Sequence, residues 1–225
     1  MSTRVLPLAL AALLAAGAAR ADPAPASADP QARYQALLSA AQAGGPDVDW
    51  GALRRAYADR PGFKVFVQNP AKRRMFEAAG AQNCAEALPA AKDVLTARFI
   101  DADAHMVAAY CEDAAGQTGA AARDRAIGAG LVKSMQTAGD GLSPATAFNV
   151  VDVDEEYSLL RALGLKLDEQ ALIQDGGHAY DALAAVDAAG RKATYYVLID
   201  RVLAAESAAL TPGAVSEGGP PGRSP

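Results

Sequence analysis

Apolar residues recur at helical spacing along the first two thirds of the chain. Three stripes show the pattern most clearly: Tyr34, Leu37, Leu38 and Ala41; Trp50, Leu53 and Tyr57; and Ile127, Leu131 and Met135. Residues at i, i+3, i+4 and i+7 share one face of an α-helix, so each stripe predicts an amphipathic helix. Turn-forming segments separate the stripes: Gly44-Gly45-Pro46, Arg60-Pro61-Gly62 and Gly116-Gln117-Thr118-Gly119. Short helices joined by tight turns are therefore predicted over residues 31–136.

Capping residues place further helices between these stripes. Asn69-Pro70 precedes a helix over 71–79, and Asn83 begins the next helix. Pro89 is expected to kink that helix or delay its start, because proline lacks the amide hydrogen that a helix interior needs. Asp101 can cap a fifth helix. This rhythm of helix pairs resembles the tetratricopeptide and Sel1-like solenoids, but their signature does not recur at a ~34-residue period, and an irregular bundle fits equally well.

Beyond residue 138 the pattern of apolar residues predicts strands as well as helices. A strand-like run over 148–153 leads into a helix over 154–163, which Gly164 is expected to end. Strands are predicted at about 171–174, 178–186 and 193–199, the last two joined by a hairpin turn. We predict an α+β fold, in which antiparallel tetratricopeptide-like hairpins precede a small α+β domain with a short antiparallel sheet. One face of that sheet is expected to pack against the helix at 154–163.

The expected organisation has five parts. They are a signal peptide at 1–21, a linker at 22–30, a helical domain at 31–137, an α+β domain at 138–204 and a disordered tail at 205–225. The signal peptide is indicated by Arg4, the apolar run Val5 to Ala16, and the small-x-small site Ala19-Arg20-Ala21. A membrane anchor is the alternative, but about a dozen apolar residues fall short of the ~20 that span a bilayer. We expect a periplasmic or secreted protein without a transmembrane segment in the mature chain.

Composition and charge narrow the class of partner. Alanine supplies 56 of the 225 residues and aromatic residues only 6%, which favours closely packed helices. The formal charge is −5, and it becomes −7 when Arg4 and Arg20 leave with the signal peptide. A negative chain does not attract phosphates, so nucleic acid is disfavoured as a partner. Another exported or envelope protein is the partner we expect.

Cys84 and Cys111 are the two cysteines of the chain. If the helices that carry them are antiparallel, both cysteines lie at nearly the same height, and the alanines around them permit close approach. An even pair outside the cytosol favours a disulfide, with two buried thiols as the alternative.

The segment from Asp140 to Asp200 carries a set of motif residues: Asp140, Gly141, Ser143, Thr146, Phe148, Glu155, Glu156, Tyr157, Gly164, Tyr180 and Asp181. Through these residues the segment resembles an uncharacterised family of secreted bacterial proteins known as a domain of unknown function. The resemblance implies a fold and export, and it implies no activity. The helices before Asp140 share it more loosely.

Few residues are candidates for chemistry. His105 with Asp101 or Asp103, and His178 with Asp175 or Asp181, are the zinc candidates, but neither set has a recognised ligand spacing. Calcium candidates are the acids Asp140, Asp152, Asp154, Glu155 and Glu156, without an EF-hand loop. Ser143 and Ser158 lack the setting of a hydrolase nucleophile. Basic clusters at Arg54-Arg55 and Lys72-Arg73-Arg74, with Trp50, Tyr57, Phe63 and Phe66 nearby, are candidates for contact with an anionic polymer.

These observations predict no catalytic, cofactor-binding or metal site. They favour a non-catalytic interaction or scaffold module of the bacterial cell envelope. The alternative is an exported metal-assisted hydrolase that uses His178 and nearby carboxylates. Binding of a small ligand between the two domains is a third reading, which the sequence does not separate from the first.

Export makes a direct prediction about the mature chain. N-terminal sequencing of the protein purified from its native host is expected to begin at or near Asp22, because signal peptidase cleaves after the small-x-small site. A mature chain that starts at Met1 or Ser2 contradicts the export prediction.

Overall fold

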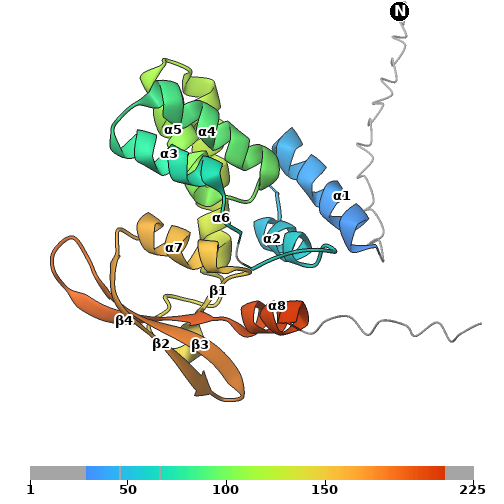
Figure 1. Ribbon diagram of the computed structural model, residues 1–225, viewed down its shortest axis with the longest axis vertical. Helices are drawn as coiled ribbons and strands as arrows, with labels where there is room; N and C mark the ends of the chain where they lie inside the picture. Colours follow the sequence, from blue (N-terminus) through green and yellow to red (C-terminus); the bar gives the residue numbers. More distant parts are fainter. Residues whose placement is uncertain (1–28, 46, 66, 211–225) are drawn as a thin grey trace, which may run out of the picture.

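A computed structural model describes residues 29–45, 47–65 and 67–210. The predicted signal peptide, nearly all of the predicted linker, Phe66 and residues 211–225 lie outside this part. Eight α-helices, one 3-10 helix and a four-stranded sheet occur in the described residues, which confirms the α+β class (Figure 1). No described helix combines the length and the apolar character that a bilayer crossing requires.

The helices before the sheet follow the predicted order. Their bounds are α1 (Pro30–Ala43), α2 (Trp50–Ala58), α3 (Pro70–Gly80), α4 (Cys84–Ala97), α5 (Ala102–Ala114) and α6 (Thr118–Met135). The capping side chains Asp49, Asn69 and Asp101 each accept a backbone N–H in the first turn that follows. Helix α4 begins directly at Cys84 and runs through Pro89, so proline does not delay its start.

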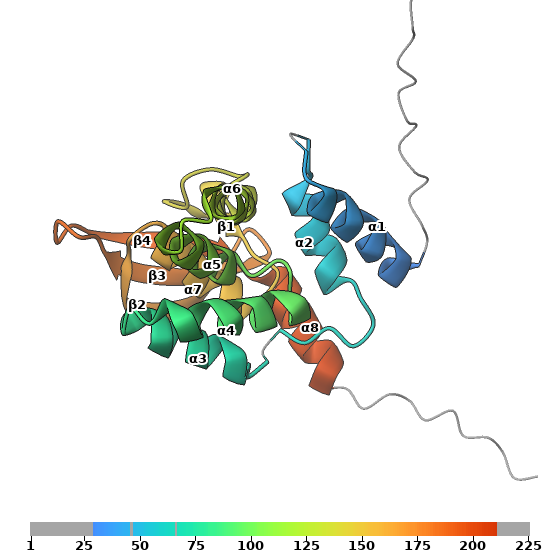
Figure 2. The same cartoon turned by 90° about the horizontal axis from the view of Figure 1, so that it is seen from above.

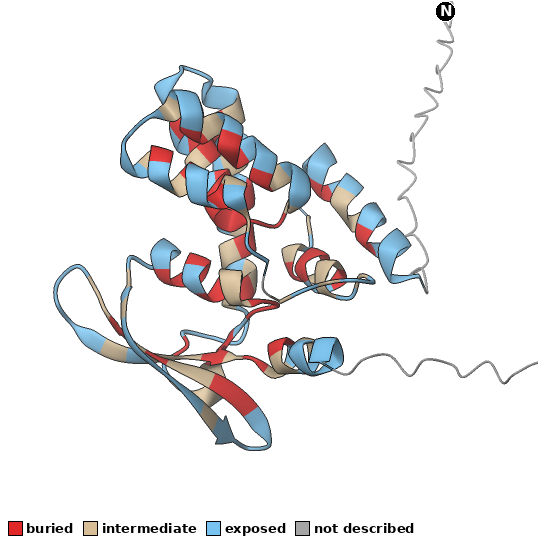
Figure 3. Ribbon diagram, in the orientation of Figure 1, coloured by how far each residue is buried: buried red, intermediate tan, exposed pale blue. Residues whose placement is uncertain are grey.

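Consecutive helices pack as neighbours. Helices α1 and α2 lie side by side at one edge of the molecule, and α3 to α6 form the larger group (Figures 1 and 2). The buried side chains of α2 and α6, among them Leu53 and Leu131, share one apolar cluster with Val151 from the chain that enters α7 (Val153–Ala162). This cluster ties the helical layer to the second half of the chain (Figure 3).

The sheet is mixed, not wholly antiparallel as predicted. Its strands are β1 (Phe148–Asn149), β2 (Lys166–Asp175), β3 (His178–Val186) and β4 (Lys192–Leu198), in the order β1-β4-β3-β2. The pairs β2–β3 and β3–β4 are antiparallel, but β1 runs parallel to β4, with Phe148 opposite Val197. The apolar run at 148–153 therefore divides: two residues pair with β4, and Val153 already begins α7.

Helix α7 lies between the sheet and the helical layer (Figure 1). Leu159 and Leu160 of α7 share a buried cluster with the β3 residues Ala179, Leu183 and Ala185. Because side chains alternate along a strand, the odd-numbered residues of β3 face the helices. The sequence prediction that one sheet face packs on this helix is confirmed.

The predicted tail begins too early. Residues 205–210 belong to helix α8 (Asp200–Leu210). Val202 of this helix is buried in the apolar cluster that α7 and the sheet share. Alanine-rich sequence favours the helix, and burial of one apolar side chain fixes it in place.

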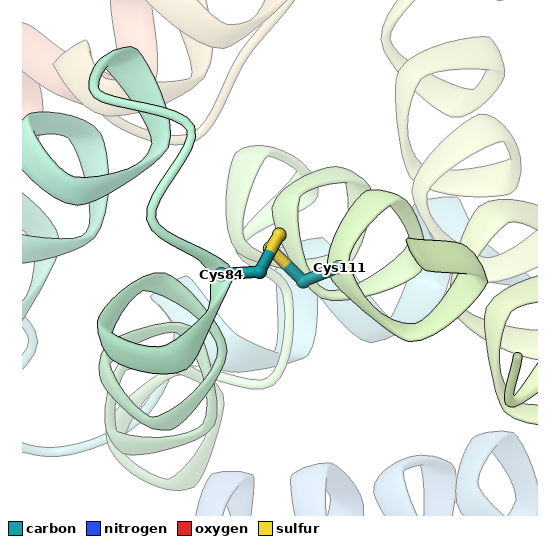
Figure 4. The surroundings of a disulfide bond; sticks show 2 residues. All are labelled: Cys84 and Cys111. Atoms are coloured by element: carbon teal, nitrogen blue, oxygen red, sulfur yellow. A yellow bond between two sulfur atoms is a disulfide. The ribbon is translucent and has the colours of Figure 1, made fainter. Parts of the chain in front are cut away.

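The disulfide between Cys84 and Cys111 is confirmed. It joins the first residue of α4 to α5, with 5.2 Å between the two Cα atoms (Figure 4). Ala87 of α4 lies buried in the same small cluster as Cys111, and this small side chain permits the close approach of the two helices here.

Removal of this bridge is expected to destabilise the fold. A Cys84→Ala/Cys111→Ala variant should lose about 2–4 kcal/mol of unfolding free energy, since the unfolded chain regains the freedom of the closed loop. Urea titration followed by circular dichroism measures the loss. Reductant should weaken the wild-type protein and leave the double variant unchanged; equal sensitivity of both proteins contradicts the prediction.

Candidate groove and the buried ion network

A buried ion pair connects α2 to α7. Arg54 Nε lies 2.8 Å from Glu155 Oε1, and Arg54 Nη2 lies 2.5 Å from Glu155 Oε2. The remaining polar contacts are also satisfied: Arg54 donates to the carbonyl oxygen of Asn149, and Glu155 accepts the backbone N–H of Val151. Burial alone raises the pKa of Glu155, but the charge and hydrogen bonds of Arg54 outweigh it and hold the pKa below its usual value.

Further ion pairs extend from this one along the N-terminal turn of α7. Arg98 Nη1 lies 2.7 Å from Asp152 and 3.4 Å from Asp154. Lys72 Nζ lies 2.8 Å from Asp101 and 3.5 Å from both Asp103 and Asp154. Lys72 of α3 and Arg98 at the end of α4 thus pair with acidic residues at the start of α5 and α7.

The network ends at Arg161 on the last turn of α7. Arg161 Nε and Nη2 donate to the two carboxylate oxygens of Asp103 at 2.9 and 2.6 Å, and Ser158 Oγ donates to Asp103 Oδ2 at 2.5 Å. Burial raises the pKa of Asp103, yet the hydrogen bonds and charge of Arg161, together with Lys72, lower it overall. Asp103 is therefore an ionised acceptor beneath the guanidinium.

A groove opens beside this last ion pair. Its two hollows, of about 520 and 260 Å³, both touch Asp103, Met106 and Arg161. We call it the α5–α7 groove, and its further walls are Phe76, Val107, Tyr110, Val132 and Ser158. Met106 and Tyr110 are large side chains one helical turn apart on α5, and they are 44% and 53% exposed.

The predicted calcium ligands are engaged elsewhere. Asp152, Asp154 and Glu155 each pair with a cation, as described above. Asp140 lies apart from them and accepts the N–H of Leu142 and the hydroxyl of Thr146. Within residues 29–45, 47–65 and 67–210, no group of three or more His, Cys, Asp or Glu side chains is arranged to hold a metal ion.

The residues of the Gly-Asp-Gly segment form a tight turn before β1. Gly141 has a φ of 75°, and a Cβ at this position would lie 2.4 Å from the Phe148 ring. The hydroxyls of Ser143 and Thr146 lie 3.0 Å apart, in a capping box. The absence of a side chain at Gly141 leaves room for the buried Phe148 ring. Gly164, with a φ of 66°, follows α7 at the predicted end of that helix.

His105 does not join its predicted neighbours. It is buried on α5, where Nδ1 lies 2.6 Å from Asp124 and Nε2 lies 2.8 Å from the carbonyl oxygen of Phe99. Asp101 and Asp103 instead bind Lys72 and Arg161. The imidazole joins α5 to α6 and to the turn before α5.

His178 also takes a different partner from the predicted Asp175 and Asp181. Its Nδ1 lies 2.5 Å from Asp200 Oδ2, and Asp200 Oδ1 accepts the N–H of Ala179 at 2.7 Å. The Ala179 N–H and the His178 contact lower the pKa of Asp200. Asp181 lies on the strand face toward α7, and Tyr180 lies on the other face, as their adjacency predicts.

Each of the two predicted basic clusters contains one buried residue and at least one exposed residue. Arg54 and Lys72 are buried in the ion network, while Arg55, Arg73 and Arg74 are exposed. Tyr57 packs edge-on against the rings of Tyr34 and Phe63, and a different cation, Arg60, lies 4.0 Å from the centre of the Tyr57 ring. Sequence reasoning missed Arg54 and Arg161 as network residues because their partners are far away along the chain.

Comparison with known proteins gives one match. The family described as "Domain of unknown function (DUF4919)" matches residues 62–208, which include α3 to α7, the whole sheet and α8 except its last two residues. No curated protein matches the chain. No solved structure matches it either.

The buried pair makes a prediction about stability. Arg54→Met is expected to cost about 3–5 kcal/mol of unfolding free energy, because Glu155 is left charged and unpaired in the interior. Adding Glu155→Gln should restore part of the loss, since the amide still accepts the Val151 N–H and carries no charge.

Urea titration of the four proteins of this double-mutant cycle measures the coupling. Arg73→Met is the matched control, because Arg73 pairs with Glu77 on the exposed face of α3 and should change stability by less than about 0.5 kcal/mol. Additive losses from the two buried substitutions contradict the proposed coupling.

Proposed function

We propose that this chain, which belongs to the DUF4919 family, is an exported, non-catalytic interaction module that binds a segment of a partner polypeptide in the α5–α7 groove. The observation that carries the proposal is the exposure of Met106 and Tyr110 together, above an Arg161 that is held in place by Asp103. Large apolar side chains beside a fixed cation are typical of the centre of a protein interface.

The groove chemistry indicates the kind of segment that it accepts. Phe76 and Met106 provide apolar contact on opposite helices, and the unbranched methionine adapts to side chains of different shape. Arg161 lies 4.9 Å from the Phe76 ring and offers a polar anchor at the edge of the apolar surface. We propose that the partner inserts one large apolar side chain and places a backbone carbonyl or carboxylate near Arg161.

A preformed groove supports this function on energetic grounds. Its α7 wall is tied through Asp103 and Lys72 to α5 and α3, so little ordering is left to occur on binding. We propose that α3–α4 and α5–α6 act as antiparallel hairpins in the manner of tetratricopeptide-like modules, which bind partners through helix surfaces.

The place of action that we propose is the cell envelope or the medium. The predicted signal peptide supports export, and a disulfide is favoured in oxidising compartments. A partner in the same compartment is then another exported or envelope protein.

Site-specific photo-crosslinking tests this function. With p-benzoylphenylalanine at Tyr110, illumination of cells of the native host should yield an adduct of defined mass, because this position lines the groove. The same probe at Leu172, which is 58% exposed on β2, is the matched control and should yield none.

Met106→Lys in the Tyr110 probe protein should abolish the adduct, since a charge replaces the apolar wall of the groove. An adduct that forms equally from Leu172, or that persists in the Met106→Lys variant, contradicts binding in the groove.

A further inference from the structure

Glu156 is a buried acid that the ion network does not use. It lies on the first turn of α7, is 2% exposed, and its Oε1 has no hydrogen-bond partner among the described residues. Its carboxyl lies in hydrogen-bonding contact with that of Asp181, which projects from the helix-facing side of β3. The buried carboxyl group of Glu156 thus meets the half-buried carboxyl group of Asp181 where α7 rests on the sheet.

Hydrogen-bond chemistry requires a proton at this contact. An ionised carboxylate only accepts, so two carboxyl groups share a hydrogen bond only when one of them is protonated. Gln170 Nε2 already donates to Asp181 Oδ2 at 2.8 Å. We place the shared proton on Glu156, because it is the more deeply buried of the two carboxyl groups and burial disfavours the charged form. Burial, reinforced by Asp181, raises the pKa of Glu156 to about 8.

The other charged groups that act on Glu156 are also acidic. They are Asp152 at the start of α7 and Glu206 on α8, in addition to Asp181 on β3. Arg98, the cation that pairs with Asp152, is shared with Asp154. Ionisation of Glu156 therefore places a fourth negative charge among three acids that come from α7, β3 and α8.

We propose that Glu156 and Asp181 form a proton-binding site that holds α7 and α8 against the sheet in acidic and neutral solution and loosens this contact in alkaline solution. The proton bridges two elements that otherwise repel each other. Since α7 also carries Ser158 and Arg161, the loosening reaches the α5–α7 groove.

The sign of the pH effect follows from proton linkage. The ordinary pKa of glutamate is 4.5, so the unfolded chain releases this proton at lower pH than the folded chain. Stability from Glu156 is complete below that value and is lost as the pH rises toward about 8. Asp152 acts in the same direction, since burial raises its pKa to about 6.

Unfolding of the full chain at a series of pH values tests the proposal. The unfolding constant of the wild-type protein should rise with pH between about 5 and 8, by up to about tenfold per pH unit for one bound proton. Glu156→Gln keeps a neutral side chain that can donate to Asp181, so its dependence should be clearly flatter. Glu77→Gln, an exposed glutamate on α3, is the matched control and should keep the wild-type dependence.

A second measurement does not depend on folding of a variant. Carbon-13 NMR of the wild-type protein, labelled at glutamate carboxyl groups, should show one resonance that titrates well above the others, near pH 8. Glutamate resonances that all titrate below about pH 6 overturn the proposal, as does an unfolding profile of Glu156→Gln that matches the wild type.

Discussion

The contact between Arg54 and Glu155 joins the two halves of the chain, and the arrangement of the other elements around α7 depends on it. Both side chains are buried, so each alone would be costly in the interior. The pair is tolerated because its polar groups find partners: the guanidinium donates to both Glu155 oxygens, to the Ser134 hydroxyl and to the Asn149 carbonyl, and Glu155 accepts the N–H of Val151. Asn149 is the last residue of β1 and Val151 lies two residues before α7, so the same contact also fixes where β1 ends and the helix begins.

Three consecutive acidic residues at the start of α7 contact three different parts of the structure. Successive residues on an α-helix point about 100° apart, so Asp154, Glu155 and Glu156 face in different directions. Asp154 faces Lys72 and Arg98, Glu155 faces Arg54, and Glu156 faces Asp181 on the sheet. In the sequence these residues are three acids at a position where a helix N-terminus favours negative charge. This pattern correctly predicts the start of the helix, but it does not indicate which residues the acids contact.

Local signals explain which parts of the fold were predictable. Caps such as Asp49 and Asp101 act within three residues, and the strand alternation of β3 and β4 is equally local, so these elements were found. The parallel pairing of β1 with β4 joins residues almost fifty apart, and α8 depends on the burial of Val202 in a distant cluster. Neither contact leaves a periodic pattern. Arg54 and Glu155 are 101 residues apart, and His178 meets Asp200 across 22 residues, so no spacing rule pairs them.

Helix α7 therefore connects the two surfaces on which our proposals rest. Its Ser158 and Arg161 meet Asp103 in the groove, while Glu156 meets Asp181 on the opposite side of the same helix. The first turn of this ten-residue helix therefore carries Glu156, and its last turn carries Arg161 of the groove. The loosening proposed at Glu156 requires that the helix move as one body. The ion pairs with Arg54, Arg98 and Lys72 oppose that movement, because each breaks only if a buried charge loses its partner. The proton on Glu156 and the ion network thus both hold α7 in place, and after loss of the proton the network alone sets how firmly the groove is held.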